Sequence, residues 1–408
     1  MLVSLLVVGI AAADVPHYSV KLTADLERQE LRGEQDLELR AEAGTLVLRK
    51  KPALAITRST GGEVVVDGET VRITLAASGR QRLHFEYTAS PGPGFRWLAD
   101  GAGFFTAFDC GAWMVCDDSP ALRATLRLEI ALPVGSRWRA VGPGSSKRSW
   151  QTKDTQHLLF ELTDPAQTYL FSFGAARLQD SSRGELRVHA PSSGHADTLW
   201  KTSLADAFFR VKAGTKHLTR GYSQVFLPGA GRGLGQEAAG MALMSEPYLA
   251  ALEEKDDVYL MAHELAHQWW GVLVGIRSWS DFWLNEGMAT FMANAFVERH
   301  QGRPAYDKRM ADLRERLEVL RKDGKDRPLH FEGWKTAQEA LGEIPYVKGA
   351  LFLDRLRTEL GDDSFWRGIL LYTSRHARGL VDSRDFQRAM EEAAGRDLKA
   401  PFDETVWR

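Results

Sequence analysis

Two histidines four positions apart carry the strongest chemical signal in this sequence. His263 and His267 enclose the residues Glu-Leu-Ala. Residues four apart on a helix lie on one face, so two imidazole nitrogens can point at one place, as two ligands of a zinc ion do. A catalytic zinc site also needs a third protein ligand and an open position for water. Glu286, 19 positions after His267 on an expected second helix, is the predicted third ligand.

Glu264 follows the first histidine directly and points off the ligand face, toward the open position. A carboxylate at that place can accept a proton from a water molecule, so Glu264 is the predicted general base. Two histidines on a half-buried helix could also be structural. The glutamate between them and the correctly spaced Glu286 favour the metal site over that alternative.

The runs His-Glu-Leu-Ala-His-Gln-Trp-Trp-Gly at 263–271 and Trp-Leu-Asn-Glu-Gly at 283–287 resemble the aminopeptidase N and leukotriene hydrolase family of zinc metallopeptidases, a group of gluzincins. The resemblance implies that the two histidines and the downstream glutamate bind one zinc ion per chain. It also implies an α+β chain, in which an antiparallel β-sandwich N-terminal domain precedes a thermolysin-like, mostly helical zinc peptidase domain.

Two further segments resemble parts of the same family. Tyr346 stands in a Tyr-x-Lys-Gly segment, whose tyrosine steadies the oxyanion in the family. Glu237 keeps the place of the family glutamate that holds the substrate's free amine, although Leu234, Gln236 and Ala238 replace the glycine, methionine and asparagine around it. The resemblance therefore implies a catalytic Tyr346 and a substrate-binding Glu237. A packed tyrosine and a flexible glycine-rich loop are the structural alternatives.

The sequence departs from the family at the residues expected around the substrate's amino end. Segment 116–124 resembles the family's pattern of Cys-x-Asp-x-Pro-x-x-Lys/Arg-Ala in the N-terminal domain. About ten residues earlier the family carries glutamine, often with an acidic residue two positions on, and this sequence has Thr106 and Phe108 there. Asp109 is adjacent and could substitute for the acidic residue.

The segments before the zinc motif have the pattern of β structure. Between about residues 18 and 178, apolar and polar residues alternate, most clearly at 122–130, as in half-buried antiparallel strands. Asp67-Gly68 between two such runs predicts a hairpin turn. Strands at this spacing favour a β-sandwich. We therefore predict a first domain at 14–179, with a boundary near the polar residues 180–184.

The predicted catalytic domain, 180–408, combines a small sheet with many helices. A strand is expected at 186–190 and a helix at 197–213, and from Ala305 onward apolar residues recur at helical spacing. Thr290, one turn after the third ligand, could hydrogen-bond that ligand. We expect it to be an ordinary threonine on the helix surface.

Composition limits the possible partners. The chain has 408 residues, 44% of them hydrophobic, and a formal net charge of −2, which gives no electrostatic reason to expect binding to nucleic acid or an anionic membrane. No run beyond the N-terminal residues reaches the roughly 18 apolar residues of a membrane-spanning helix. Peptides with a free N-terminus are the expected partners, and the oligomeric state stays open.

Residues 1–13 form an apolar run that ends in small residues before Asp14, as in a signal peptide that lacks its basic region. We expect export to the periplasm or the outside, and a cytoplasmic protein with a buried N-terminal strand is the alternative. Cys110 and Cys116 are the only cysteines, too few for a disulfide framework. They could pair in an exported chain or stay free in the core.

These residues predict a zinc-dependent aminopeptidase that hydrolyses the N-terminal peptide bond of peptides. Zinc would polarise the scissile carbonyl and activate water, Glu264 would transfer the proton, and Tyr346 would stabilise the oxyanion. Two alternatives stay open. One is a zinc endopeptidase of the same catalytic type, which Thr106, Phe108 and Ala238 favour, and the other is a non-catalytic peptide-binding protein.

Overall fold

The structure is a computed structural model that describes residues 7–8, 15–231 and 233–408. The predicted signal peptide at 1–13 lies outside the described residues except for Val7 and Val8. Within the described residues, no helix combines the length and the apolar character that crossing a membrane would require.

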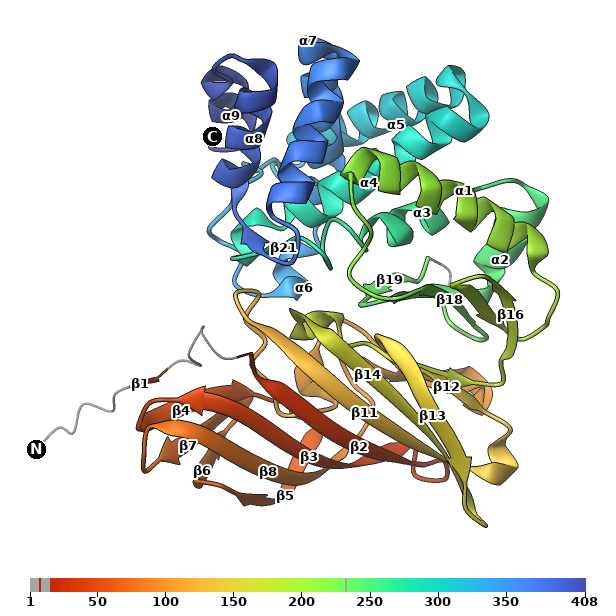
Figure 1. Cartoon of the computed structure of the whole chain (residues 1–408), viewed down its shortest axis with the longest axis vertical. Coiled ribbons are helices and arrows are strands. Elements are labelled where there is room, and N and C mark those ends of the chain that lie inside the picture. The colour runs from red at the N-terminus through yellow and green to blue at the C-terminus, as the bar shows by residue number, and fades with distance from the viewer. Residues whose placement is uncertain (1–6, 9–14, 232) are drawn as a thin grey trace, which may run out of the picture. The chain divides into compact units, whose positions relative to one another are not determined.

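The chain forms two compact units. The first comprises Met1–His195 and Thr219–Leu249, and the second comprises Ala196–Leu218 and Ala250–Arg408. Strands dominate the first unit and helices the second, so the α+β class predicted from the sequence is confirmed (Figure 1).

Seven strands form the largest sheet of the first unit, in the order β13-β14-β11-β2-β3-β8-β5. Their bounds are β2 His17–Asp25, β3 Glu30–Ala41, β5 Leu54–Thr60, β8 Gly79–Ala89, β11 Arg123–Pro133, β13 Ser145–Gln151 and β14 Thr155–Gln167. Neighbouring strands are antiparallel, as predicted, except that β2 and β11 run parallel. Every second residue of β3 is buried, as the alternating sequence pattern requires when one face of a sheet is apolar.

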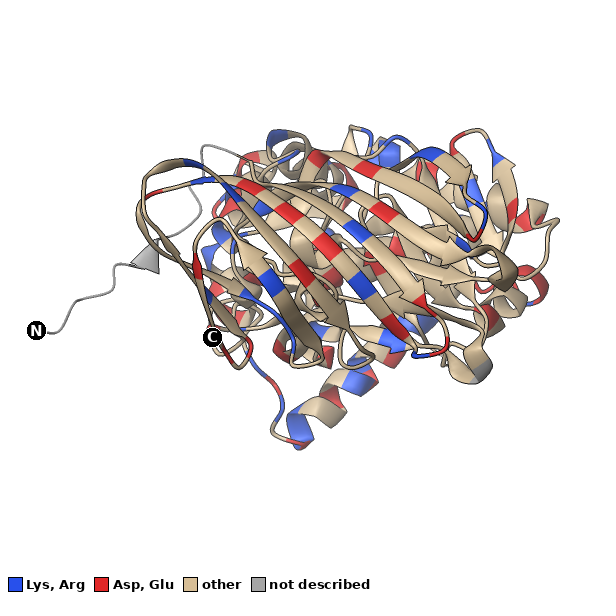
Figure 2. Cartoon of the chain, turned by 90° about the horizontal axis from the view of Figure 1, so that it is seen from below, with Lys and Arg blue, Asp and Glu red and all other residues tan. Residues whose placement is uncertain are grey.

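Figure 2 shows the outer face of this sheet, where charges of both signs lie on neighbouring strands. Arg82 pairs with Asp36 at 3.0 Å, and Lys21 pairs with Glu34 at 3.9 Å. Exposed pairs of this kind contribute about 0–1 kcal/mol each, because water screens them. The face is therefore a solvated surface of mixed charge.

Three smaller sheets complete the first unit, in the orders β1-β4-β7-β6, β12-β15-β10-β9 and β16-β17-β18-β20-β19. Their bounds are β1 Val7–Val8, β4 Gly44–Arg49, β6 Glu63–Asp67, β7 Thr70–Leu75, β9 Phe95–Trp97, β10 Gly103–Thr106, β12 Arg139–Val141, β15 Gly174–Ala176, β16 Gln179–Arg183, β17 Leu186–Ala190, β18 Tyr222–Leu227, β19 Gly235–Ala238 and β20 Met241–Ser245. The predicted Asp67-Gly68 turn joins β6 to β7. The expected domain boundary at 180–184 falls in the β16–β17 hairpin, and Cys110 and Cys116 form a disulfide.

The second unit is mostly helical. Its helices, with one that begins at the end of the first unit, are α1 Ala196–Ala213, α2 Glu246–Glu254, α3 Tyr259–Ala266, α4 Trp283–Gln301, α5 Arg303–Lys322, α6 Ala337–Ala340, α7 Glu343–Arg375, α8 Ser383–Ala394 and α9 Lys399–Thr405. The helix expected at 197–213 is confirmed as α1. The region after Ala305 is not wholly helical, because β22 (Leu380–Val381) pairs with β21 (Gly275–Ile276).

Helix α4 is the centre of this unit. Every residue from Trp283 to Val297 is buried, so the helix has no exposed face over four turns. Such a helix must be apolar nearly all round, and any polar residue on it needs a partner. Glu286, near its beginning, is therefore held in a rigid and largely dry environment.

Candidate functional site

Three donor atoms of the second unit converge on one point. The Nε2 atoms of His263 and His267 lie 3.1 Å apart, and each lies 3.3 Å from Oε2 of Glu286. Ligand atoms bound to a tetrahedral zinc ion at about 2.0–2.1 Å are separated by about 3.3 Å. The three residues are at most 6% exposed. The fold thus brings together the three predicted ligands at the spacing of a tetrahedral metal site.

The electrostatics of this triangle suit a cation. Burial lowers the pKa of His263, which keeps its imidazole neutral. Burial raises the pKa of the Glu286 carboxyl, but the interactions with the adjacent His267 and His263 outweigh it, so this pKa lies below its ordinary value. Neutral imidazoles and an ionised carboxylate are the forms that bind metals. The donor set of two nitrogens and one carboxylate fits zinc.

The end of the histidine motif positions His267. Helix α3 ends at Ala266, and the carbonyl oxygen of Trp270 accepts a hydrogen bond of 3.2 Å from His267 Nδ1, which leaves Nε2 free to act as a ligand. Gly271 lies at φ 139°, where other residues are strained. A Cβ atom there would lie 3.4 Å from His267 Nδ1. That contact is an ordinary one, so glycine at this position is favoured by its backbone conformation.

A close helix crossing positions the third ligand beside Tyr346. A Cβ atom on either Gly287 or Gly349 would lie 2.8 Å from the Cα atom of the other, so α4 and α7 touch through their backbones. Glu286 directly precedes the first glycine, and Tyr346 lies about one turn before the second. The Tyr346 ring stacks on the His263 imidazole with centroids 6.0 Å apart and planes 13° apart. The contact between α4 and α7 thus fixes the position of Tyr346, the predicted oxyanion donor, relative to Glu286.

Glu264 occupies the position expected of the general base. It lies on α3 and is 3% exposed. One of its carboxylate oxygens lies within 4.8 Å of a ring nitrogen of His267. A carboxylate beside the ligands, yet outside the triangle of donor atoms, can exchange protons with a molecule bound at the open position.

Glu237 belongs to the first unit. It lies on β19, the edge strand of the five-stranded sheet, where it pairs with Ala242 of β20. Part of the expected glycine-rich loop is therefore a strand. The Glu237 side chain is 2% exposed, and its Oε2 accepts a hydrogen bond of 3.2 Å from Nε2 of Gln236. The glutamine that replaces the family methionine thus supports the carboxylate next to it.

Two residues near the predicted amine pocket are engaged elsewhere in the first unit. Thr106 is 1% exposed, and its hydroxyl accepts a hydrogen bond of 3.0 Å from the backbone N–H of Phe173. Asp109 pairs with Lys51 at 3.4 Å. The Thr106 hydroxyl therefore serves the core of the unit, and the Asp109 carboxylate already has a cation beside it.

Phe108 has an unusual backbone conformation. Its φ is 56°, in the left-handed region that large side chains rarely adopt. Its ring stacks on Tyr169, with centroids 6.2 Å apart and planes 12° apart. Phe108 thus contributes an aromatic ring and no charge to this part of the first unit.

The expectation that Thr290 lies on the helix surface is wrong. Thr290 is 1% exposed, because α4 is buried on all sides at this level. Sequence reasoning also missed Tyr259, one turn before His263 on α3, whose ring centroid lies 6.0 Å from that of the imidazole. The sequence did contain a signal for Tyr259, because residues four positions apart on a helix lie on the same face and Tyr259 stands four positions before His263.

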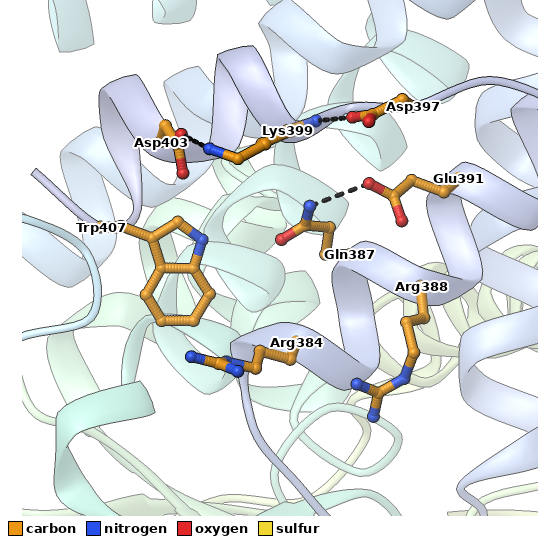
Figure 3. A pocket seen from close by; sticks show the side chains of 8 residues that line it. All are labelled: Arg384, Gln387, Arg388, Glu391, Asp397, Lys399, Asp403 and Trp407. Carbon is orange, nitrogen blue, oxygen red and sulfur yellow. Dashed lines mark hydrogen bonds and ion pairs between the residues drawn. The ribbon is translucent and has the colours of Figure 1, made fainter.

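An open pocket of about 420 Å³ lies between α8 and α9 (Figure 3). Its charged groups largely satisfy one another: Lys399 pairs with Asp403, and Gln387 donates a hydrogen bond of 2.8 Å to Glu391. None of the candidate site residues lines it. The pocket therefore adds nothing to the chemistry of the metal centre.

Comparison with known proteins agrees with this geometry. Residues 226–405 match the model of the peptidase family M1 domain. The chain is 26% identical over 319 residues to aminopeptidase N of Streptomyces lividans, which covers 69% of this chain and 35% of that protein. It is 25% identical over 308 residues to leucine aminopeptidase 2 of Ajellomyces capsulatus, which covers 72% and 49%. The chain thus matches about a third to a half of the length of these relatives.

The fold also resembles a solved structure over nearly its whole length. The M1 zinc metallopeptidase from Deinococcus radiodurans superimposes with a TM-score of 0.76 at 22% identity, over 95% of this chain and 91% of that chain. This likeness confirms the fold predicted from the sequence, with sheets in the N-terminal part and helices in the C-terminal part.

Proposed function

We propose that this chain is a member of peptidase family M1, and that it is a zinc-dependent aminopeptidase that releases the first residue of peptides with a free N-terminus. The observation that carries the proposal is the buried triangle of His263, His267 and Glu286, whose donor atoms have the spacing of zinc ligands. The aminopeptidase names of the relatives favour cleavage at the amino end.

These three residues would hold one zinc ion, which when bound supplies a Lewis acid for the carbonyl oxygen and lowers the pKa of a water molecule. Glu264, buried beside His267, would accept the proton of the attacking water and deliver it to the leaving amine. Since Glu264 follows a ligand on one helix, its position relative to the donor atoms is set by the helix itself.

Tyr346 would donate a hydrogen bond from its hydroxyl group to the oxygen of the substrate carbonyl as negative charge develops on that oxygen. A donor of this kind is effective when it is already in place before the reaction. Two features support such preorganisation: the ring stacks on His263, and the Gly287–Gly349 contact fixes the helix that carries the tyrosine.

Glu237 would bind the ammonium group of the substrate. Its carboxylate is nearly excluded from water, where an ionised group needs a compensating charge or hydrogen bonds. The support is the family position of this glutamate and its burial on an edge strand. Pairing with a free amine would make the enzyme an exopeptidase.

A panel of fluorogenic aminoacyl substrates, each tested with a free and an N-acetylated amine, decides between activities. We expect hydrolysis of the free-amine forms only, loss of that activity with a chelator, and its return with zinc. Equal cleavage of the acetylated forms would contradict the aminopeptidase proposal. If the protein binds zinc but hydrolyses none of the substrates, the alternative of a non-catalytic peptide-binding protein is favoured.

A zinc endopeptidase is the second candidate. The observation that favours it is the first unit's Thr106, whose hydroxyl is used in the core, beside an Asp109 that already pairs with Lys51. An amine pocket without its usual partners would bind a free N-terminus less strongly. An internally quenched peptide blocked at both ends would be cleaved by an endopeptidase and not by an aminopeptidase.

We also propose export of the protein. The apolar residues 1–13 support it, and so does the disulfide between Cys110 and Cys116, since disulfides persist in oxidising compartments. Expression of the tagged full-length gene followed by cell fractionation tests the proposal. Recovery of the protein with the cytoplasmic fraction and with its first residues intact would contradict it.

A further inference from the structure

The two histidines of the metal centre differ in what holds their rings. His267 Nδ1 donates to the Trp270 carbonyl oxygen, whereas His263 Nδ1 is buried and has no hydrogen-bond partner within the described ranges. A metal-bound histidine usually donates its second N–H to an oxygen, and this bond orients the ring. The orientation of the His263 ring therefore depends on other contacts.

Two tyrosine rings flank the His263 imidazole. Tyr346 stacks on it at 6.0 Å and 13°, and Tyr259 contacts it at 6.0 Å and 38°. Tyr259 lies one turn before His263 on α3, so its ring faces the imidazole along the helix surface. Packing against two rings restricts the rotation of the imidazole about its side-chain bonds.

Tyr259 is itself held from its other side. The guanidinium carbon of Arg309, on α5, lies 3.7 Å from the centroid of the Tyr259 ring, which is the geometry of a cation–π contact. Arg309 Nε donates to Asn294 Oδ1 at 2.6 Å, and Asn294 Nδ2 donates to the Thr290 carbonyl oxygen at 2.8 Å. Thr290 and Asn294 lie one and two turns after Glu286, on the same face of α4.

Arg309 links the two helices that carry the proposed ligands. It lies over the Tyr259 ring of α3 and donates a hydrogen bond to Asn294 of α4. Behind the donor atoms, α3 and α4 are thus joined through Tyr259, Arg309 and Asn294.

We propose that Tyr259 is a positioning residue of the metal centre: its ring, held in place by Arg309, keeps the His263 imidazole turned toward Glu286 and so sets the affinity for zinc. This inference rests on the proposed function, because zinc is the ion proposed for the site. It assigns to Tyr259 no contact with substrate. The aromatic ring carries the effect.

The test measures zinc affinity directly, by competition with a chromophoric chelator, together with the melting temperature of the metal-free protein. We expect Tyr259→Leu to raise the zinc Kd by about 10–100-fold, the usual range for residues that orient metal ligands. Tyr259→Phe keeps the ring and should stay within about threefold of the parent. Arg309→Met removes the cation over the ring and should raise the Kd by about 3–10-fold.

Tyr306 provides a matched control in the same unit. It is 1% exposed, donates a hydrogen bond of 2.6 Å to Asp354 and lies beneath the guanidinium of Arg303 at 5.1 Å. It shares the cation contact of Tyr259 and is more deeply buried, and it stacks on neither proposed histidine ligand. Tyr306→Leu should lower the melting temperature and leave the zinc Kd unchanged.

Each outcome decides something. A zinc Kd in Tyr259→Leu equal to that of the parent would overturn the positioning role. So would a loss of zinc affinity in Tyr259→Phe as large as that in Tyr259→Leu. An equal loss of zinc affinity in the control Tyr306→Leu would overturn it as well. If Tyr259→Leu fails to fold, a parent-like Kd in Arg309→Met overturns it. A parent that binds no zinc would overturn the proposed function together with this inference, whereas the other outcomes leave that function intact.

Discussion

The metal centre and the region assigned to the substrate's amino end are built in different ways. The three proposed zinc ligands lie within 24 positions of one another, on two helices packed together in one unit. The residues assigned to the amine are spread over the first unit, from the loop after β10 to the edge strand β19. The proposed zinc ligands, whose spacing must be accurate, thus come from segments that are close in the sequence. The residues proposed to recognise the substrate's amine come from segments that are far apart in the sequence.

This difference affects how each region tolerates change. The metal centre shares its supports, because the Gly287–Gly349 contact fixes Glu286 and Tyr346 together. At the region proposed for the amine, Thr106 and Phe108 make contacts within the first unit, and Glu237 presents a buried carboxylate. We therefore expect substitutions at the metal centre to abolish turnover, and substitutions at Glu237 to change substrate preference.

The largest expected effect is that of Glu264→Gln. The substitution keeps the size of the side chain and removes the proton acceptor, so kcat should fall by about 10²–10⁴-fold while zinc content stays at that of the parent. Steady-state kinetics and elemental analysis of the same preparation measure both quantities. Turnover at half of the parent value would show that another group is the base.

Tyr346→Phe comes next. Losing one oxyanion donor should lower kcat by about 10²–10³-fold and leave KM nearly unchanged, because the hydroxyl acts only as charge develops. The retained ring still stacks on His263, so zinc binding should persist. A rise in KM with an unchanged kcat would instead place the tyrosine in substrate binding.

Glu237→Ala is the sharpest test of the contrast between the two regions. Free-amine substrates should lose about 2–5 kcal/mol in kcat/KM, as expected when one partner of a buried charge pair is removed. N-acetylated substrates, already poor, should change little. If Glu237→Ala lowers kcat/KM by the same factor for free and acetylated substrates, Glu237 has no role in amine binding, and the endopeptidase candidate gains support.

Gly349→Ala has the smallest expected effect on chemistry and tests the shared support. The new Cβ atom would meet the Gly287 backbone at 2.8 Å, so α4 and α7 must separate slightly, at a cost of about 1–3 kcal/mol in the free energy of unfolding. We expect a lower kcat as well, because Tyr346 moves with α7. Gly135→Ala, which meets nothing within 4 Å, is the control. If Gly349→Ala is less stable than the parent but has an unchanged kcat, the contact between α4 and α7 is not needed for catalysis.

The convergence of the donor atoms of His263, His267 and Glu286 could be predicted from the sequence, because their spacing is local. The four-residue spacing of His263 and His267 follows from the helix period, and Glu286 lies on the next helix of the motif. The alternating strands and the helix at 197–213 were predictable for the same reason: burial imposes a period on the sequence.

The contacts that the sequence did not reveal are long-range. Thr290 was expected on a surface because its own helix pattern cannot show that α4 is covered on every side. Tyr259 gains its role from Arg309, which lies 50 positions away on another helix. The parallel pairing of β2 with β11 likewise joins segments about 100 residues apart. Such contacts depend on how elements pack, which no local period encodes.

The most direct test of the central claim is the titration of chelator-treated, metal-free protein with zinc while hydrolysis of a free-amine aminoacyl substrate is followed. The triangle formed by His263, His267 and Glu286 predicts that activity is absent at first, rises linearly and reaches its maximum at one zinc per chain. Full activity in the metal-free protein, or no activity at any zinc concentration, would contradict the assignment of a zinc aminopeptidase.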